Sequence, residues 1–220
     1  MVRPRVRIRF SKQSALRLIG HRDLMRSLER LFRRAGLSLG MSEGYRPKPR
    51  MNFPLALAVG IEGRREVMEL ELNEAPPADE LLARLQPQAP PGLRFESLEV
   101  LPPGSPGTRL RVARAVSASY QIAVTRSTGC PASRLPGLEE RIQRLLSAST
   151  SLIRRPNRSA PIDLRAALLA LALRDGSLEM RLKTDPGGSA GPRDVLAALG
   201  LEDLEHEGTV LTRSDVEIDS

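Results

Sequence analysis

One stretch of the sequence, residues 21–50, carries most of the side chains that could do chemistry. Its first residue, His21, could act as a general base or contact RNA, and Asp23 is the carboxylate nearest to it in the chain. The simpler interpretation is a histidine that is buried or caps a helix, with Asp23 paired to Arg26 three residues later. His21 and Asp23 are therefore the two candidate catalytic residues.

The same stretch is rich in cations, which bind phosphate groups. The candidate RNA- or phosphate-binding residues are Arg22, Arg26, Arg30, Arg33, Arg34, Tyr45, Arg46, Lys48 and Arg50. Tyr45 is the aromatic side chain among them and the candidate for stacking on a base. Carboxylates nearby, such as Glu29 four residues before Arg33, either form simple helix ion pairs or orient the arginines toward phosphate.

A helix over residues 21–35 and a loop over residues 42–50 must position these groups. Apolar side chains repeat with helical spacing and arginines fall on the opposite side; the apolar positions are Leu24, Leu28, Leu31, Phe32 and Ala35. Gly36 follows as a helix stop. In the loop, Gly44 permits a turn and two prolines keep the residues before them out of helical geometry. We expect a stiff loop with its cations held outward.

Positive charge is concentrated at the start of the chain. The 220 residues include 34 Lys and Arg and 26 Asp and Glu, for a net charge of +8. Residues 1–50 hold 14 of the basic and 3 of the acidic residues, which leaves 20 basic and 23 acidic residues to the rest. Such asymmetry is typical of a surface that binds nucleic acid; an acidic partner protein and a merely well-solvated surface are the alternatives.

The composition excludes several classes of site. Cys130 is the single cysteine, so this chain alone cannot hold an internal disulfide, a cysteine-rich zinc site or an iron–sulfur cluster. The two histidines are far apart, which gives no metal or triad spacing, and there is no Gly-rich phosphate loop for nucleotide hydrolysis. We expect no bound metal or cofactor. The lack of a signal pattern or long apolar run predicts no membrane association and a cytoplasmic location.

The first half of the chain has the order β-α-β-β-α-β. In residues 5–10, Val6, Ile8 and Phe10 alternate with arginines, whose face is either an ordinary half-solvated strand face or a basic face open to RNA. The other elements are an apolar extended segment over 51–59, a strand over 66–72, a helix over 77–85 and a strand over 93–101. This order predicts the ferredoxin-like fold.

The second half repeats the pattern more weakly. Its expected elements are strands over 120–124 and 151–155, a helix over 138–146, a hairpin of 167–173 and 177–182 across an Asp-Gly turn, a flexible loop over 184–191, a helix over 192–199 and a strand over 210–218. We predict an α+β protein of two tandem ferredoxin-like units, residues 1–101 and 118–220, joined by a linker over 102–117. A second basic cluster either faces the first or is a solvated loop; its members are Arg154, Arg155, Arg158 and Arg165.

In residues 21–49, the run H-R-D-L-M-R-S-L-E-R-L-F-R-R-A is followed by S-E-G-Y-R-P-K-P. These motifs resemble a bacterial family of radical S-adenosylmethionine-associated proteins of unknown function. The positions that match the family pattern are His21, Asp23, Arg26, Glu29, Arg30, Arg33, Arg34, Ser42, Gly44, Pro47 and Pro49. The likeness is specific over residues 5–75 and weaker beyond, where residues 162–165 (I-D-L-R) are similar to a D-I-R-P segment.

This sequence departs from the family pattern in three places. Tyr45 and Arg46 replace Phe-Asn, Lys48 replaces His, and Ala166 stands where Pro is usual. A role for the loop histidine is therefore not carried over. The resemblance implies a partner, a cobalamin-binding radical S-adenosylmethionine protein encoded beside or fused to this chain, which would house any radical chemistry.

Three hypotheses from different classes follow. We expect a non-catalytic RNA-binding module that presents tRNA or rRNA to the radical S-adenosylmethionine protein for modification or processing. The first alternative is a metal-independent ribonuclease or RNA-modifying enzyme, which requires an exposed His21 beside the basic loop. The second is a subunit that docks an acidic protein without RNA, which exposed apolar residues near 51–57 would favour.

Overall fold

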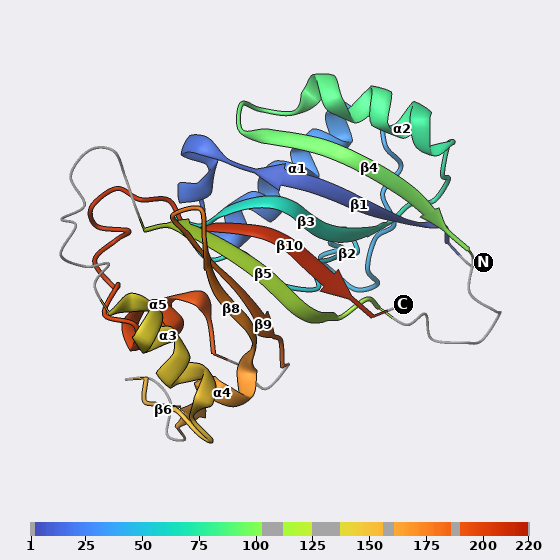
Figure 1. The fold of residues 1–220 in the computed structure, drawn as a ribbon. Coiled ribbons are helices and arrows are strands. Elements are labelled where there is room, and N and C mark those ends of the chain that lie inside the picture. Colours follow the sequence, from blue (N-terminus) through green and yellow to red (C-terminus); the bar gives the residue numbers. More distant parts are fainter. Residues whose placement is uncertain (1–2, 103–111, 125–136, 156–160, 186–189, 220) are drawn as a thin grey trace. The chain divides into compact units, whose positions relative to one another are not determined.

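The computed structural model describes residues 3–102, 112–124, 137–155, 161–185 and 190–219. It divides the chain into two compact units, of which unit 1 comprises residues 1–115 with 218–220 and unit 2 comprises residues 116–217. The architecture is mixed α+β with mostly antiparallel strands (Figure 1). Residues 103–111 of the expected linker lie outside the described residues.

Unit 1 alternates strands and helices. Its elements are β1 (Arg5–Lys12), α1 (His21–Arg34), β2 (Met51–Asn52), β3 (Glu62–Glu71), α2 (Ala78–Leu85) and β4 (Leu93–Leu101), with 3₁₀ turns at Ser14–Leu18 and Gln86–Gln88. β1 pairs antiparallel with both β3 and β4, and β2 pairs antiparallel with β3. The strand order of this unit is therefore β4-β1-β3-β2.

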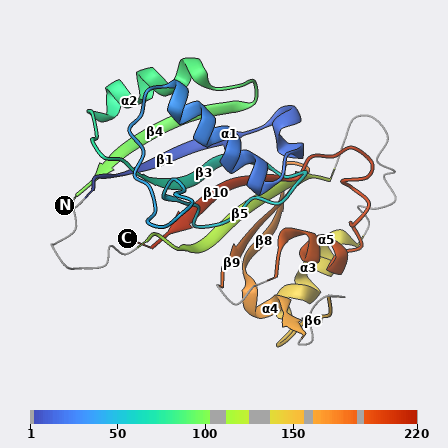
Figure 2. The same cartoon turned by 180° about the vertical axis from the view of Figure 1, so that it is seen from behind.

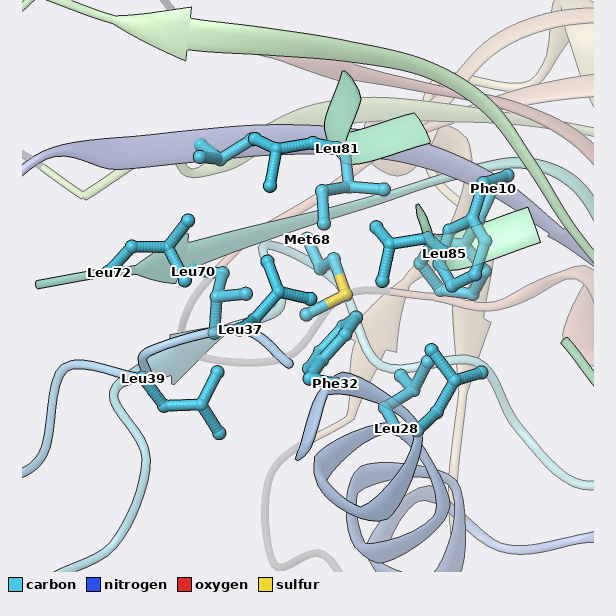
Figure 3. Close-up of a cluster of buried hydrophobic side chains, with 14 of the residues drawn as sticks. Phe10, Leu28, Phe32, Leu37, Leu39, Met68, Leu70, Leu72, Leu81 and Leu85 are labelled. Carbon is cyan, nitrogen blue, oxygen red and sulfur yellow. The ribbon is translucent and has the colours of Figure 1, made fainter. Parts of the chain in front are cut away.

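Both helices of unit 1 pack on one face of its sheet. The inward face of β1 was predicted from the alternation, and Val6, Ile8 and Phe10 are indeed buried. The buried positions of α1 are Leu24, Leu28, Leu31 and Phe32, as its periodicity predicted. In Figure 3, Phe32 of α1 and Leu81 and Leu85 of α2 approach Met68 of β3. Each such side chain contributes about 1.5–3 kcal/mol relative to an exposed one, so this core fixes α1 against the sheet.

Two segments of unit 1 differ from the sequence-based expectation. β3 begins four residues earlier than the expected strand, and its buried residues on both faces include the carboxylates Glu66 and Glu69. The segment expected to be extended over 51–59 forms a strand only at Met51–Asn52. It then turns, with Leu57 buried.

Unit 2 also alternates strands and helices. Its elements are β5 (Ala115–Ala123), α3 (Leu138–Ser147), β6 (Leu152–Ile153), β7 (Ile162–Asp163), α4 (Leu164–Ala167), β8 (Leu168–Arg174), β9 (Ser177–Lys183), α5 (Pro192–Ala198) and β10 (Thr212–Ile218). The short strands β6 and β7 and the short helix α4 are inserted between α3 and β8. The strand order is β10-β5-β9-β8, and β6 pairs with β7 in a separate ribbon. Figure 2 shows α3 and α5 side by side, as does Figure 1.

The hairpin expected across the Asp-Gly turn is confirmed in unit 2. β8 and β9 form a hairpin in which Arg174 pairs with Ser177. The two residues between them, Asp175 and Gly176, have φ angles of 48° and 72°. Positive φ at both positions is the geometry that an Asp-Gly hairpin turn requires. The loop expected over 184–191 lies partly outside the described residues.

Unit 1 takes its last residues from the chain that follows unit 2. The backbone N–H of Arg114 donates a hydrogen bond to Oδ1 of Asp219 at 2.7 Å. The backbone N–H of Asp219 donates in return to the carbonyl oxygen of Arg114 at 2.9 Å. The points where the chain leaves unit 1 and comes back to it are therefore bonded to each other.

None of the helices in the described residues is both long enough and apolar enough to cross a lipid bilayer.

Candidate functional site

α1 presents a row of arginines to solvent. Its apolar stripe faces the core, so the side chains on the other side of the helix are exposed; these are Arg22, Arg26, Arg30, Arg33 and Arg34. The helix has 14 residues, which corresponds to a length of about 21 Å. We refer to these five residues as the α1 arginines. They form a cationic ridge rather than a pocket.

Three of the α1 arginines have partners. Arg26 Nη1 lies 3.4 Å from Oδ1 of Asp23, and Arg33 Nη2 lies 3.0 Å from Oε1 of Glu29. Arg34 donates to the side chain and the carbonyl oxygen of Gln88 at 3.4 and 3.3 Å. Exposed helix pairs of this kind stabilise by only about 0.2–0.5 kcal/mol, so a phosphate can displace them at little cost.

The loop over residues 42–50, here called the basic loop, is closed at its base. The backbone N–H of Ser42 donates to the carbonyl oxygen of Lys48 at 2.8 Å, and the N–H of Lys48 donates to Oγ of Ser42 at 2.9 Å. Below this pair, the N–H of Arg50 donates to the carbonyl oxygen of Gly40 at 2.9 Å. Gly44 has a φ of 116°, which a glycine tolerates. The base of the loop is thus fixed while the residues between project outward.

The basic loop begins at the same end of the sheet as the C-terminus of α1. α1 begins beside the far end of β1, where Lys12 Nζ donates to the carbonyl oxygen of Ile19 at 2.9 Å. After α1 the chain reaches Gly40, whose N–H donates to the carbonyl oxygen of Glu71 at 2.8 Å. Glu71 is paired with Arg5 at the opposite end of β1. The C-terminal arginines of α1 and the base of the basic loop therefore share one end of unit 1.

Four exposed cations of this region have no partner for their charge among the described residues. Within the described parts of the chain, no hydrogen bond or ion pair engages the side chains of Arg22, Arg30, Arg46 and Lys48. Arg50 differs, because its Nη1 lies 3.7 Å from Oε2 of Glu71. We refer to the α1 arginines and the basic loop together as the cationic surface.

His21 packs against an aromatic ring. It is half-buried at the start of α1, and its ring meets Phe53 edge to face at 5.0 Å between centroids. Burial, and then the positive charge of Lys12, lower the pKa of His21 below its ordinary value of 6.5. The imidazole is therefore neutral at neutral pH and can accept a proton. Asp23, the other candidate catalytic residue, is exposed and bound to Arg26.

The arginines of β1 are largely neutralised. Arg5 and Arg7 both donate to the carboxylate of Glu69, which also accepts from the backbone N–H of Ala113. Arg5 and Glu69 are buried. A hollow of about 270 Å³ beside them is lined by Arg5, Arg50, Asn52, Glu69, Glu71 and Val112. Its two arginines and two carboxylates balance, so the hollow does not select an anion.

The second basic cluster is mostly engaged in holding unit 2 together. Arg155 forms two hydrogen bonds with the carboxylate of Asp194, which raise its pKa. Arg165 donates to the carbonyl oxygens of Leu146 and Leu168 at 3.0 and 3.1 Å. Arg154 is exposed, and Arg158 lies outside the described residues.

The carboxylate in the I-D-L-R segment has a local structural role. Asp163 accepts from the backbone N–H groups of Ser151 and Arg165 at 2.9 and 3.0 Å. These bonds to the charged carboxylate, that from Ser151 first, lower its pKa. Asp163 thereby caps α4 and ties it to the residues before β6.

Sequence reasoning missed the residues that support the site through long-range contacts. Arg84 of α2 binds the carbonyl oxygens at the end of α1, and buried Lys12 binds the turn before it. The spacing of residues in the sequence does not predict these contacts, because the partners are far apart in the chain. Lys12 follows Val6, Ile8 and Phe10 at the next inward position of β1. This spacing was the one feature of the sequence that could have predicted its burial.

No metal centre is formed by the residues that the structure describes: no group of three or more His, Cys, Asp and Glu side chains is placed to hold an ion. Cys130 lies outside those residues.

Comparison with known proteins identifies one family. The sequence model of a family described as "Uncharacterized protein conserved in bacteria (DUF2344)" matches residues 5–192. No protein with curated annotation matches the sequence. Among solved structures, the crystal structure of an unknown protein from Galdieria sulphuraria is similar over 100% of both chains, with 11% sequence identity and a TM-score of 0.29. A likeness this weak carries no argument about fold or activity.

Proposed function

The chain belongs to this family of conserved bacterial proteins, and we propose that it is a non-catalytic RNA-binding module whose site is the cationic surface. The family description gives no reaction and no partner. The proposal is therefore argued from the side chains of unit 1.

The observation that carries the proposal is the set of four exposed cations that have no partner among the residues the structure describes. Arg22, Arg30, Arg46 and Lys48 hold their charges in water, so binding a phosphate breaks no ion pair within the described part of the chain. Each cation that neutralises a phosphate releases a condensed counterion, which favours association. The α1 arginines extend over about 18 Å along the helix, which suits a polyanion better than a single small anion.

The fold supports a structural class for the two units but does not by itself support a ligand. The orders β4-β1-β3-β2 and β10-β5-β9-β8, each with helices between the strands, support assigning both units to the ferredoxin-like class. That class serves many functions, so the assignment does not name the ligand. The RNA proposed is tRNA or rRNA, presented for modification or processing to a radical S-adenosylmethionine protein. The support for that partner is the likeness of residues 21–49 to proteins associated with such enzymes.

The test is RNA binding as a function of salt concentration. We compare wild type with the variant Arg30→Gln/Arg46→Gln/Lys48→Gln, which removes three cations of the cationic surface. The matched control, Arg94→Gln/Arg144→Gln/Lys183→Gln, removes three exposed cations from β4, α3 and β9. Affinity for tRNA and rRNA fragments is measured by filter binding across a range of salt concentrations.

The expected result is a site-specific change in the salt dependence. In the first variant the slope of log affinity against log salt decreases by about two to three units, since each lost phosphate contact removes about 0.7–0.9. The control keeps the wild-type slope. Equal losses in both variants would indicate general charge attraction, and the absence of any wild-type binding at low salt would overturn the proposal.

A further inference from the structure

We infer that the basic loop binds an unpaired RNA base on the ring of Tyr45, so that the RNA ligand is one with a single-stranded loop or bulge and not a plain duplex. This inference rests on the proposed RNA-binding function and names the class of RNA that the cationic surface takes.

The exposure of Tyr45 separates it from the other aromatic residues. Its side chain is 97% exposed, whereas Tyr120 is 8% exposed. The phenylalanines are buried or half-buried; they are Phe10, Phe32, Phe53 and Phe95. In a chain with 3% aromatic residues, one ring kept wholly in water is available for a ligand on both of its faces.

The construction of the loop keeps the ring away from the protein. The paired backbone groups of Ser42 and Lys48 close the base, and the pairing of Gly40 with Glu71 holds that base to the end of β3. A Cβ atom built on Gly44 would meet nothing within 4 Å, which shows that the tip stands clear of the rest of unit 1. A ring on an anchored loop loses less conformational entropy on binding than one on a free segment.

The charges beside Tyr45 favour a nucleic acid as the occupant. Arg46 follows the ring directly and Lys48 follows two residues later, and neither charge has a partner among the described residues. Glu43 is the one carboxylate of the loop. A base stacked on the ring would carry its flanking phosphates toward these two cations, which combines stacking with charge attraction. In a duplex the base faces are already stacked on one another, so only an unpaired base can use the ring.

Intrinsic fluorescence tests the inference directly. The chain has two tyrosines and no tryptophan. In a Tyr120→Phe background, Tyr45 is the sole tyrosine and reports its own surroundings. The probes are an RNA hairpin with an unpaired loop and a blunt RNA duplex of the same number of nucleotides. The signal is corrected for absorbance by the RNA, and affinities are measured in parallel by filter binding.

The expected result has two parts. The hairpin changes Tyr45 fluorescence and the duplex does not. Tyr45→Ala lowers hairpin affinity by about 5- to 150-fold, the fold-change that stacking of one base supplies, and leaves duplex affinity and the salt slope unchanged. Tyr45→Phe retains hairpin binding because it retains the ring.

The outcomes separate this inference from the proposed function. If wild type binds hairpin and duplex equally and Tyr45→Ala changes neither, the inference is wrong and the RNA module stands. If wild type binds neither RNA, the proposed function itself fails. If anionic phospholipid vesicles change Tyr45 fluorescence and the hairpin does not, the ring serves a membrane surface and the inference is also overturned.

Discussion

The guanidinium of Arg84 closes the C-terminal end of α1. Its Nη2 donates to the carbonyl oxygen of Gly36 at 2.6 Å, and its Nε donates to that of Ala35 at 3.1 Å. The last carbonyl groups of a helix have no partner within the helix, and a positive charge there also interacts favourably with the helix dipole. A residue of α2 thus stabilises the helix that carries the α1 arginines.

Replacing Arg84 will destabilise unit 1. Arg84→Ala is expected to lower the free energy of unfolding by about 1–3 kcal/mol, because it removes two hydrogen bonds from a charged donor. The measurement is urea denaturation followed by circular dichroism. Arg94→Ala removes an exposed arginine on β4 and should change the value by less than about 0.5 kcal/mol. Equal effects of the two substitutions would contradict the capping role.

The buried ion pair of Arg5 and Glu69 gives a second prediction. Glu69→Ala leaves Arg5 buried without its carboxylate and should lower the free energy of unfolding by about 3–5 kcal/mol. Glu99→Ala is the matched control, since Glu99 also pairs with Arg7 but is exposed, and its loss should cost less than about 1 kcal/mol. The double change Arg5→Met/Glu69→Leu should be milder than Glu69→Ala, since neither member of this pair is then left as a buried charge.

The lowered pKa of His21 predicts a pH dependence of stability. Its folded-state pKa lies below that of the unfolded chain, so the unfolded chain binds the proton more tightly. The free energy of unfolding should therefore fall as the pH decreases through about 6.5, until the folded-state value is passed. Asp163 and Glu217, whose pKa values are also lowered, titrate at lower pH.

Denaturation across this pH range checks the assignment to His21. The variant His21→Leu keeps an apolar side chain against Phe53 and removes the titrating group. It should show a smaller loss of stability between neutral and mildly acidic pH than wild type. An unchanged pH dependence in this variant would assign the effect to another group.

Gly40 is predicted to be required at the base of the basic loop. A Cβ atom at this position would lie 2.8 Å from Cβ of Glu71 and 3.1 Å from its carbonyl oxygen. Gly40→Ala should therefore displace the loop base and lower the free energy of unfolding by about 1–3 kcal/mol. For Gly20→Ala the nearest atom is 3.9 Å away, and the cost should stay below about 1 kcal/mol. Thermal denaturation of both variants provides the comparison.

Local patterns predicted much of the fold. The spacing of Leu24, Leu28 and Leu31 defines the buried face of α1, and Gly36 ends the helix with a φ of 69°. Each of these signals acts within a few residues, so the sequence contains it directly. β6 lies within the strand expected over 151–155, but its partner β7 has only two residues and no periodic pattern that could predict the pairing.

The sequence predicted which side chains of the candidate site are exposed, but not which of them form hydrogen bonds or ion pairs. Helical periodicity places Arg30 and Arg34 on the same outer side, and both are exposed. That Arg34 binds Gln88 while Arg30 binds no described residue depends on α2 and the turn after it, which periodicity does not reach. The burial of Glu69 likewise follows from the arginines of β1, 62 and 64 residues earlier in the chain.

The mutual hydrogen bonds of Arg114 and Asp219 have a consequence for the order of folding. During synthesis, the strands β1 to β4 and the helices α1 and α2 of unit 1 leave the ribosome before unit 2 does, so the apolar core that they form can collapse first. The clamp between residues 114 and 219 can form only once unit 2 has been made, and it then closes a loop of roughly a hundred residues. Unit 2 is thus an insertion in the chain of unit 1, and the hydrogen bonds between the residues that flank it, Arg114 and Asp219, form last.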